Sequence, residues 1–390
     1  MSTNGINYYA ELGIINLISS KDFGEAINRH ILELRRKEGI DCPDTFIIPI
    51  KQDRFSNGEG KIILQETARA KDIYIICDIG NHNCRYKLYG HDNRMGPDEH
   101  FQDVKRAIFA IGGKAARVSV VMPLLYASRQ DRNKGRESLD CAVALQELER
   151  MGVKDVITFD VHNPTVQNAI PLLSFENLYA TEAIIRAICE DEGEMIKAPD
   201  NILIISPDSG GMERAIYYST ILNINIGMFY KRRDFSRLVD GTHPIEQHDY
   251  LGQDVEGKDV IIIDDMIASG ASIAECVHDL KERGANKVFV AATFSMFTKG
   301  PDIFQELYEE NKLTRLYSTN LTYATDEVIS SDWFRRVDLA PFTASVINTL
   351  NTNKSIAPLI NRTDRLREMI SNHRLTPKHN PSLPTDSQWI

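Results

Sequence analysis

Two adjacent carboxylates end an apolar run in the stretch VIIIDDMIASGAS, which covers residues 260–272. Asp264 and Asp265 follow four branched apolar residues, a composition typical of a strand buried on both faces. A loop of small residues comes next, before a segment of helical period, and it consists of Ser269, Gly270, Ala271 and Ser272. Backbone N–H groups in such a loop can bind one anion together, helped by the dipole of the following helix.

A sugar phosphate suits this combination of groups. Asp264 and Asp265 would repel a phosphate, so we expect them to lie beside it and to bind neutral hydroxyls or a cation. The phosphate would then occupy the loop, with Ser269 and Ser272 adding hydroxyl donors, and the ribose hydroxyls would meet the two carboxylates. The alternative is that Asp264 only caps the next helix.

Polar residues also follow other apolar runs of the chain. In an open α/β sheet, ligands bind at the carboxyl ends of the strands. His162 lies in FDVHN and Asp208 lies in SPDSGG, both at predicted strand ends. Asp208 suits Mg²⁺ or a ribose, because Mg²⁺ prefers oxygen ligands. Gly210 and Gly211 would let the backbone approach a pyrophosphate closely. A lone histidine is more often structural than functional.

Basic side chains occur in two further segments. Arg129 and Gln130 in SRQDR offer a guanidinium fork for a polyphosphate and an amide for phosphate or a base edge. Lys231 and Arg233 follow an apolar strand in YKRR and precede a polar loop that we expect to be flexible. Phosphoryl transfer needs positive charge beside the nonbridging oxygens of the transferred group, which carry negative charge in the transition state. Taken alone, YKRR is better explained as a solvated surface cluster.

The segment RFSNGE contains an aromatic ring and two groups that can bind the edge of a base. Phe55 could stack on adenine, while Asn57 and Glu59 could form hydrogen bonds with it. The chemistry alone favours a simpler interpretation, a turn with one core phenylalanine.

The elements that must position these residues are strands that alternate with helices. Short apolar runs recur at KDIYIICDIG, ARVSVVMPLL, VKDVITFDV, NILIISPD, KDVIIIDD and NKVFVAATF. Segments of helical period lie between them, and two of these stop at Gly152 and Gly284. Such alternation predicts mostly parallel sheets with right-handed crossovers. The pattern occurs before and after residue 178, which predicts two α/β domains.

The totals limit the function further. The chain has 390 residues, of which 42% are hydrophobic and 26% are charged. Its net charge of −10 argues against nucleic acid or an anionic membrane as the main partner. The six cysteines have no paired spacing, so we expect no disulfide framework and no zinc site. Neither a signal peptide nor an apolar run of about 18 residues is present, and we expect a cytoplasmic protein.

The set of motifs resembles the ribose-phosphate pyrophosphokinase family over residues 12–350. The motifs occur in the family's order and approximate spacing, and they are RFSNGE, SRQDR, FDVHN, SPDSGGMERA, YKRRDFS and DDMIASGAS. The resemblance implies two tandem phosphoribosyltransferase-like domains, each a mostly parallel sheet flanked by helices, of which the second keeps the sugar-phosphate loop. We place these domains at residues 1–177 and 178–345, followed by an extension at 346–390 whose end we expect to be flexible.

The resemblance also implies the reaction, which is transfer of a diphosphate from Mg·ATP to the anomeric hydroxyl of ribose 5-phosphate, with release of AMP. It gives Lys231, Arg233 and Arg129 the role of stabilising the transferred group. It assigns ATP to Arg129, Gln130, His162 and the RFSNGE residues, and the metal to His162 and Asp208. It implies a homo-oligomer, a dimer or hexamer, in which a neighbouring subunit helps to bind adenine.

Some residues depart from the family pattern, and the departures lie around the acceptor site. The sugar-phosphate loop lacks the usual acid, and Ala271 replaces a glycine. The polar segment 81–103 is longer than its family counterpart. These departures leave a second hypothesis open, transfer to a larger acceptor such as ADP-ribose. A non-catalytic regulatory homologue is a third hypothesis, and the presence of Lys231 and Arg233 argues against it.

Overall fold

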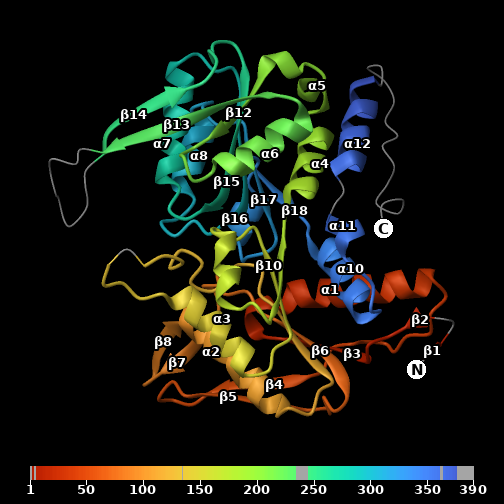
Figure 1. Cartoon of the computed structure of the whole chain (residues 1–390). Coiled ribbons are helices and arrows are strands. Elements are labelled where there is room, and N and C mark those ends of the chain that lie inside the picture. The colour runs from red at the N-terminus through yellow and green to blue at the C-terminus, as the bar shows by residue number, and fades with distance from the viewer. Residues whose placement is uncertain (1, 4–5, 134, 234–244, 361–362, 376–390) are drawn as a thin grey trace.

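The computed structural model describes residues 2–3, 6–133, 135–233, 245–360 and 363–375. Two mostly parallel sheets, one above the other, form its framework (Figure 1). The first sheet has the strand order β11-β10-β9-β6-β3. Its strands are β3 (Glu11–Asn16), β6 (Lys71–Ile76), β9 (Arg117–Val121), β10 (Asp155–Phe159) and β11 (Ser174–Leu178). All of their pairings are parallel, as the alternation of strands and helices predicts.

The second sheet has the strand order β14-β13-β12-β15-β16-β17-β18. Its strands are β12 (Ile202–Ser206), β13 (Asn225–Arg233), β14 (Ile245–Leu251), β15 (Asp259–Ile267), β16 (Val288–Ser295), β17 (Arg315–Thr319) and β18 (Phe334–Val337). Only β13 and β14 pair in antiparallel fashion, at the edge of the sheet. The six apolar runs all lie in strands of the two sheets, which confirms their prediction.

Helices cover the faces of both sheets. The longer ones are α1 (Lys21–Lys37), α2 (Pro97–Ile111), α3 (Asp140–Arg150), α4 (Thr181–Asp191), α6 (Met212–Leu222), α7 (Ala271–Glu282), α8 (Asp302–Glu309), α10 (Ala340–Asn351) and α12 (Thr363–Leu375). The short helices are α5 (Gly193–Ile196), α9 (Asp326–Ile329) and α11 (Ala357–Ile360). Gly152 and Gly284 follow α3 and α7 with φ of +87° and +85°, so each helix ends where a left-handed residue is needed.

In the described part of the chain, three antiparallel hairpins stand apart from the two large sheets. They are β1–β2 (Ser2–Thr3 and Ile6–Asn7), β4–β5 (Ile50–Arg54 and Gly60–Leu64) and β7–β8 (Arg85–Leu88 and His91–Arg94). The β7–β8 hairpin occupies the long polar segment and packs beside the β4–β5 turn, where the Tyr89 N–H donates to the Ser56 carbonyl at 2.8 Å. The sequence pattern did not predict it, because it has no buried apolar face.

One hydrophobic core joins the two sheets. Ile76 and Ile157 of the first sheet and Ile261 and Phe289 of the second belong to the same buried cluster. Helix α10 comes from the C-terminal part of the chain but packs against α1, where Arg35 donates to Asn348 and Asn351 at 2.8 and 2.6 Å (Figure 1). The predicted boundaries after residues 177 and 345 fall within β11 and α10, and they stay predictions.

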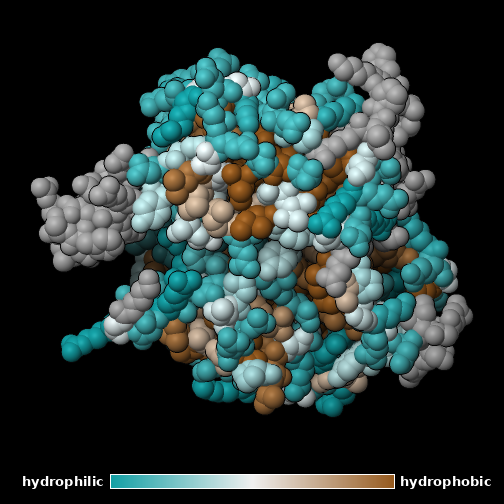
Figure 2. Space-filling model, turned by 45° about the horizontal axis from the view of Figure 1, so that its top comes forward, coloured by the Kyte–Doolittle hydropathy of each residue, from teal (hydrophilic) through white to brown (hydrophobic). Residues whose placement is uncertain are grey.

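Most of the molecular face in Figure 2 is hydrophilic, with hydrophobic side chains gathered in a few separate patches. All six cysteines are free thiols, and five of them are buried. No helix in the described part of the chain is long and apolar enough to cross a membrane.

Candidate functional site

A hydrogen bond between His162 and Asp265 joins the carboxyl ends of strands from the two sheets. His162 follows β10, and Asp265 lies near the end of β15. The His162 Nδ1 atom is 2.8 Å from Asp265 Oδ2. The Asp265 side chain is 7% exposed and that of His162 is 45% exposed, so the pair has one buried and one accessible member. The structure therefore brings together two residues that were predicted from separate motifs.

Asp264 and Asp265 differ in their tendency to ionise. Burial and the neighbouring Asp265 charge raise the pKa of Asp264 well above its ordinary value. Burial alone would raise the pKa of Asp265 too, but the hydrogen bond with His162 and the charge of Arg214 outweigh it and lower that pKa. In return, the hydrogen bond with Asp265 raises the pKa of His162, despite partial burial of the ring. Asp265 is thus the more acidic carboxyl of the two.

Arg214, Asp160 and Thr293 complete this junction, and sequence reasoning assigned none of them. Arg214 lies in the first turn of α6 and holds Asp160 through Nε and Nη2, at 3.0 and 2.7 Å from Oδ1. The Thr293 hydroxyl of β16 donates to Asp160 Oδ2 at 2.5 Å. Arg214 and Asp160 stand inside the motifs SPDSGGMERA and FDVHN, which was the only available signal for them.

The small-residue loop follows β15 and leads directly into α7, which begins at Ala271. Gly270 has φ of +87°, and a Cβ atom there would lie 2.5 Å from the ring of Phe304. A glycine is therefore required at this position for both backbone and space. The Ala271 N–H lies 3.4 Å from Ser269 Oγ. The loop, Ser272 included, thus lies at the same sheet edge as Asp264 and Asp265, at a helix N-terminus.

Asp208 follows β12 and is exposed. Its Oδ1 accepts hydrogen bonds from the N–H groups of Gly210 and Gly211, at 2.8 and 3.1 Å. These two N–H groups, which we expected to approach a pyrophosphate, hold the Asp208 side chain in this structure. The turn leads into α6, and so Asp208 and Arg214 are positioned by the same short segment.

The loop after β9 lies beside the loop after β10. Asn163 Nδ2 donates to Asp131 Oδ2, and the charge of Arg129 opposes protonation of His162. Arg129 and Gln130 are exposed. The segments SRQDR and FDVHN, predicted to bind ATP, therefore share one edge of the first sheet.

The remaining predicted residues belong to the β4–β5 turn and to strand β13. Phe55, Asn57 and Glu59 lie in the β4–β5 turn, at the far end of the first half from β15 (Figure 1). Phe55 is 54% exposed, so it is not the core residue of the simpler interpretation. Lys231 and Arg233 have their backbone in β13, opposite His248 and Ile245 of β14. Their side chains, and residues 234–244 of the loop, lie outside the described part of the chain.

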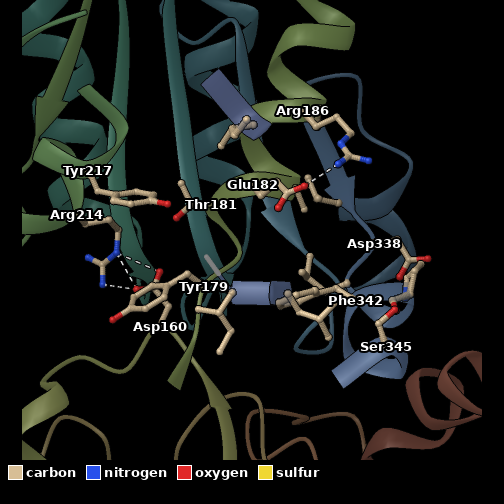
Figure 3. Close-up of a pocket in the computed structure, with 18 of the residues that line it drawn as sticks. Asp160, Tyr179, Thr181, Glu182, Arg186, Arg214, Tyr217, Asp338, Phe342 and Ser345 are labelled. Atoms are coloured by element: carbon tan, nitrogen blue, oxygen red, sulfur yellow. Dashed lines mark hydrogen bonds and ion pairs between the residues drawn. The ribbon is translucent and has the colours of Figure 1, made fainter. Parts of the chain in front are cut away.

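A cavity of about 930 Å³ opens beside Asp160 and Arg214 (Figure 3). Tyr179 and Tyr217 stand at that end, while Phe342 stands at the other. Helices α11 and α12 contribute part of the wall. Within the described residues, no three His, Cys, Asp or Glu side chains are grouped as a metal site.

The arrangement of the motifs agrees with comparisons to known proteins. Residues 12–152 match the family model of the N-terminal domain of ribose phosphate pyrophosphokinase. Residues 174–303 match the phosphoribosyl transferase domain, and residues 249–361 match the phosphoribosyl synthetase-associated domain. The chain belongs to the ribose-phosphate pyrophosphokinase family. Helix α12 lies beyond the residues matched by these family models.

Curated relatives of the ribose-phosphate pyrophosphokinase family align over most of the chain. The ribose-phosphate pyrophosphokinase of Bacillus cereus is 27% identical over 363 residues, which are 93% of this chain and 100% of the relative. Ribose-phosphate pyrophosphokinase A of Dictyostelium discoideum is 28% identical over 311 residues, 80% of this chain and 89% of the relative.

A solved structure shares the fold. Phosphoribosylpyrophosphate synthetase from Mycobacterium smegmatis superimposes with a TM-score of 0.70 at 19% identity, over 88% of this chain and 99% of that one. The two-domain, phosphoribosyltransferase-like architecture expected from the sequence is therefore confirmed.

Proposed function

We propose that this chain is a pyrophosphokinase that transfers the β,γ-diphosphate of Mg·ATP to the anomeric hydroxyl of ribose 5-phosphate, giving phosphoribosyl pyrophosphate and AMP. The observation that carries the proposal is the hydrogen bond between His162 and Asp265. His162 belongs to the motifs expected to bind ATP, and Asp265 belongs to those expected to bind the sugar. One contact therefore supports a common site for both substrates.

The acceptor would lie at the end of β15. Asp264 and Asp265 would bind the ribose hydroxyls, and the loop 269–272 at the N-terminus of α7 would bind the 5-phosphate. Asp265, whose pKa is lowered, would accept hydrogen bonds as an anion. The anomeric oxygen would then attack the β-phosphorus and release its proton to solvent. The bond between the β-phosphorus and the oxygen that bridges to the α-phosphorus would break, and AMP would leave with that oxygen.

The nucleotide side of the site would come from the first sheet and from YKRR. Arg129 and Gln130 lie in the loop that adjoins the His162 loop, and they would bind the phosphates. Lys231 and Arg233 would face the transferred diphosphate, where positive charge stabilises the transition state. Their position at the end of β13, which lies between β14 and β12 in the same sheet as β15, suits this role.

A magnesium ion would be held mainly by the phosphates of ATP. Mg²⁺ keeps several waters and needs only one or two protein ligands at such sites. Asp208, with its exposed carboxylate, and His162, through the ring nitrogen not bonded to Asp265, would fill that role. When bound, the ion would neutralise charge on the transferred phosphates.

The adenine base would be bound between subunits. Phe55, Asn57 and Glu59 lie on a hairpin remote from the junction, and Phe55 is exposed. A second copy of the chain could bring this turn to the nucleotide, which supports a homo-oligomer, a dimer or hexamer, as the active form. The compartment that we expect is the cytoplasm.

The acceptor assay tests this proposal. Purified protein is incubated with Mg·ATP and either ribose 5-phosphate or ADP-ribose, and the products are identified by mass. We expect phosphoribosyl pyrophosphate and AMP from ribose 5-phosphate, with much slower turnover of ADP-ribose. Faster diphosphate transfer to ADP-ribose would overturn the proposed acceptor. No product from either acceptor would favour the regulatory homologue. The relatives are named ribose-phosphate pyrophosphokinase, which favours neither ADP-ribose as the acceptor nor a regulatory homologue.

A further inference from the structure

Arg214 lies between the acidic groups that the two halves of the molecule bring to the site. Its guanidinium binds Asp160, which follows β10, with three contacts of 2.7 to 3.1 Å. Its charge also interacts with Asp264 and Asp265 of β15. One partly buried cation thus interacts with three carboxylates, of which one comes from the first half and two come from the second. Figure 3 shows the contact with Asp160 at one end of the cavity.

Asp160 has no capacity left to bind a substrate directly. Its side chain is 3% exposed, and both of its oxygens are held by Arg214 and by the Thr293 hydroxyl. We therefore expect Asp160 to act by fixing the position of the residues that follow it in the chain.

The backbone at Asp160 turns in a way that directs the next residues. Asp160 has φ of +44°, in the left-handed region that non-glycine residues adopt infrequently. Its N–H donates to the Leu178 carbonyl at 2.7 Å, and the Val161 N–H donates to Asn177 Oδ1 at 3.1 Å. His162 stands two residues further on and meets Asp265. Fixing the Asp160 side chain therefore fixes the path that brings His162 to β15.

We propose that Arg214 is a positioning residue, which holds the loop of residues 160–163 against the second sheet and so aligns the nucleotide side with the acceptor side. This inference rests on the proposed transfer reaction. The guanidinium suits the task because two of its nitrogens bind one carboxylate while its delocalised charge reaches the other two acids. A lysine at this position would keep the charge but lose the paired contact.

Steady-state kinetics of Arg214→Gln and Arg214→Lys, with Mg·ATP and ribose 5-phosphate, test the inference. Misplacement of reacting groups by about 1 Å costs about 100-fold in rate, so we expect kcat of Arg214→Gln to fall about 100-fold. Arg214→Lys should recover part of this loss. KM for both substrates should change less than about threefold, because most of the groups expected to bind each substrate lie outside the loop of residues 160–163. Arg186→Gln is the matched control, since Arg186 lines the same cavity but pairs with Glu182 within α4.

Two further variants keep the test informative if Arg214→Gln folds poorly. Thr293→Val removes only the hydroxyl contact to Asp160 and should lower kcat several-fold at unchanged KM. Asp160→Asn combined with Arg214→Gln should lose little more than the worse single variant, because the two residues act as one unit.

The possible failures can be told apart. A wild-type protein that forms no phosphoribosyl pyrophosphate contradicts the proposed function itself. An active wild type with a fully active Arg214→Gln variant contradicts the positioning role. A selective rise in KM for one substrate would assign Arg214 to direct binding instead, and additive losses in the double variant would separate it from Asp160.

Discussion

Asp264 and Asp265 carry the same side chain at adjacent positions, yet their surroundings give them opposite properties. Asp265 is buried against His162 and near Arg214, and these contacts lower its pKa. Burial and the Asp265 charge raise the pKa of Asp264. A site that must bind sugar hydroxyls next to phosphates gains from this difference, because a second full charge would repel the phosphates.

Replacement of Asp265 by asparagine tests its role as an anion. The amide keeps the size of the side chain but cannot carry the charge that His162 and the sugar hydroxyls would meet. We expect kcat/KM for ribose 5-phosphate to fall about 100-fold, equivalent to about 2.7 kcal/mol. Asp259→Asn, at the opposite end of β15, is the control and should stay within about twofold of wild type. Equal effects of the two substitutions would contradict the assignment.

Single residues were predictable to different degrees. Asp265 and His162 stood out because acids and a histidine directly follow apolar runs, where α/β proteins bind ligands. Arg214 and Thr293 did not stand out, because their importance comes from a partner in the other half of the molecule. The spacing of residues along one chain segment does not reveal such a pairing.

The loop between β15 and α7 owes its shape to one glycine at the element boundary. Gly270 has a left-handed backbone, and the ring of Phe304 from α8 fills the space beside its Cα atom. The loop sequence departs from the family pattern at Ala271, yet it keeps glycine at the one position where backbone and packing both demand it. The packing of α8 on α7 is thereby linked to the shape of the phosphate loop.

Gly270→Ala should damage both stability and acceptor binding. Left-handed strain and overpacking against Phe304 should together lower the free energy of unfolding by about 2–4 kcal/mol. The shifted loop should also raise KM for ribose 5-phosphate more than KM for ATP. Gly257→Ala is a matched control, because Gly257 has φ of +71° but no atom within 4 Å of the added Cβ. Urea unfolding and steady-state kinetics measure both effects. Equal destabilisation of the two variants would show that contact with Phe304 does not contribute to the loss of stability in Gly270→Ala.

Elements with a buried apolar face were predictable from the sequence, and polar elements were not. The runs that became β6, β10 and β15 have the branched composition of strands buried on both faces. The β7–β8 hairpin has mostly exposed, polar side chains, so no period marked it. Its position beside the Phe55 turn became visible only in three dimensions.

At the scale of the molecule, buried polar contacts at the ends of strands hold the two halves together. Asp78 follows β6 and accepts hydrogen bonds from the Gly80 N–H and, across the junction, from Thr322 and the Tyr323 N–H after β17. Burial raises the pKa of Asp78 to about 7, although these donors favour its ionised form. The junction between the halves thus contains a carboxyl that is protonated at mildly acidic pH.

The free energy of unfolding should therefore decrease as pH rises through the range in which Asp78 ionises in the folded protein. The folded-state pKa of Asp78 lies above its unfolded value, so the folded protein binds the proton more tightly. The resulting stabilisation, about 4 kcal/mol for a shift of this size, is fully present below about pH 4 and is lost as pH rises through 7. Asp78→Asn should have a flatter stability profile between pH 5 and 8, measured by thermal unfolding. Asp44→Asn, at an exposed site, is the control, and parallel profiles for wild type and Asp78→Asn would contradict the prediction.

The arrangement of the whole molecule was only partly predictable. Two α/β units followed from the alternation of strands and helices, and the comparisons confirm this architecture. The packing of α10 against α1 could not be foreseen, because chain order places α10 with the second half. Nor could the sequence pattern reveal that the Phe55 turn lies away from the other site residues, the observation behind our proposal of a site shared between subunits.

The central claim is that one cleft, formed by both halves, transfers a diphosphate from ATP directly to the sugar. Phosphorus NMR of a mixture of protein, Mg·ATP and ribose 5-phosphate tests it most directly. We predict that AMP and phosphoribosyl pyrophosphate appear in equal amounts and that omission of ribose 5-phosphate stops AMP formation. Release of ADP or inorganic phosphate in place of AMP, or AMP formation that does not depend on the sugar, would contradict this claim.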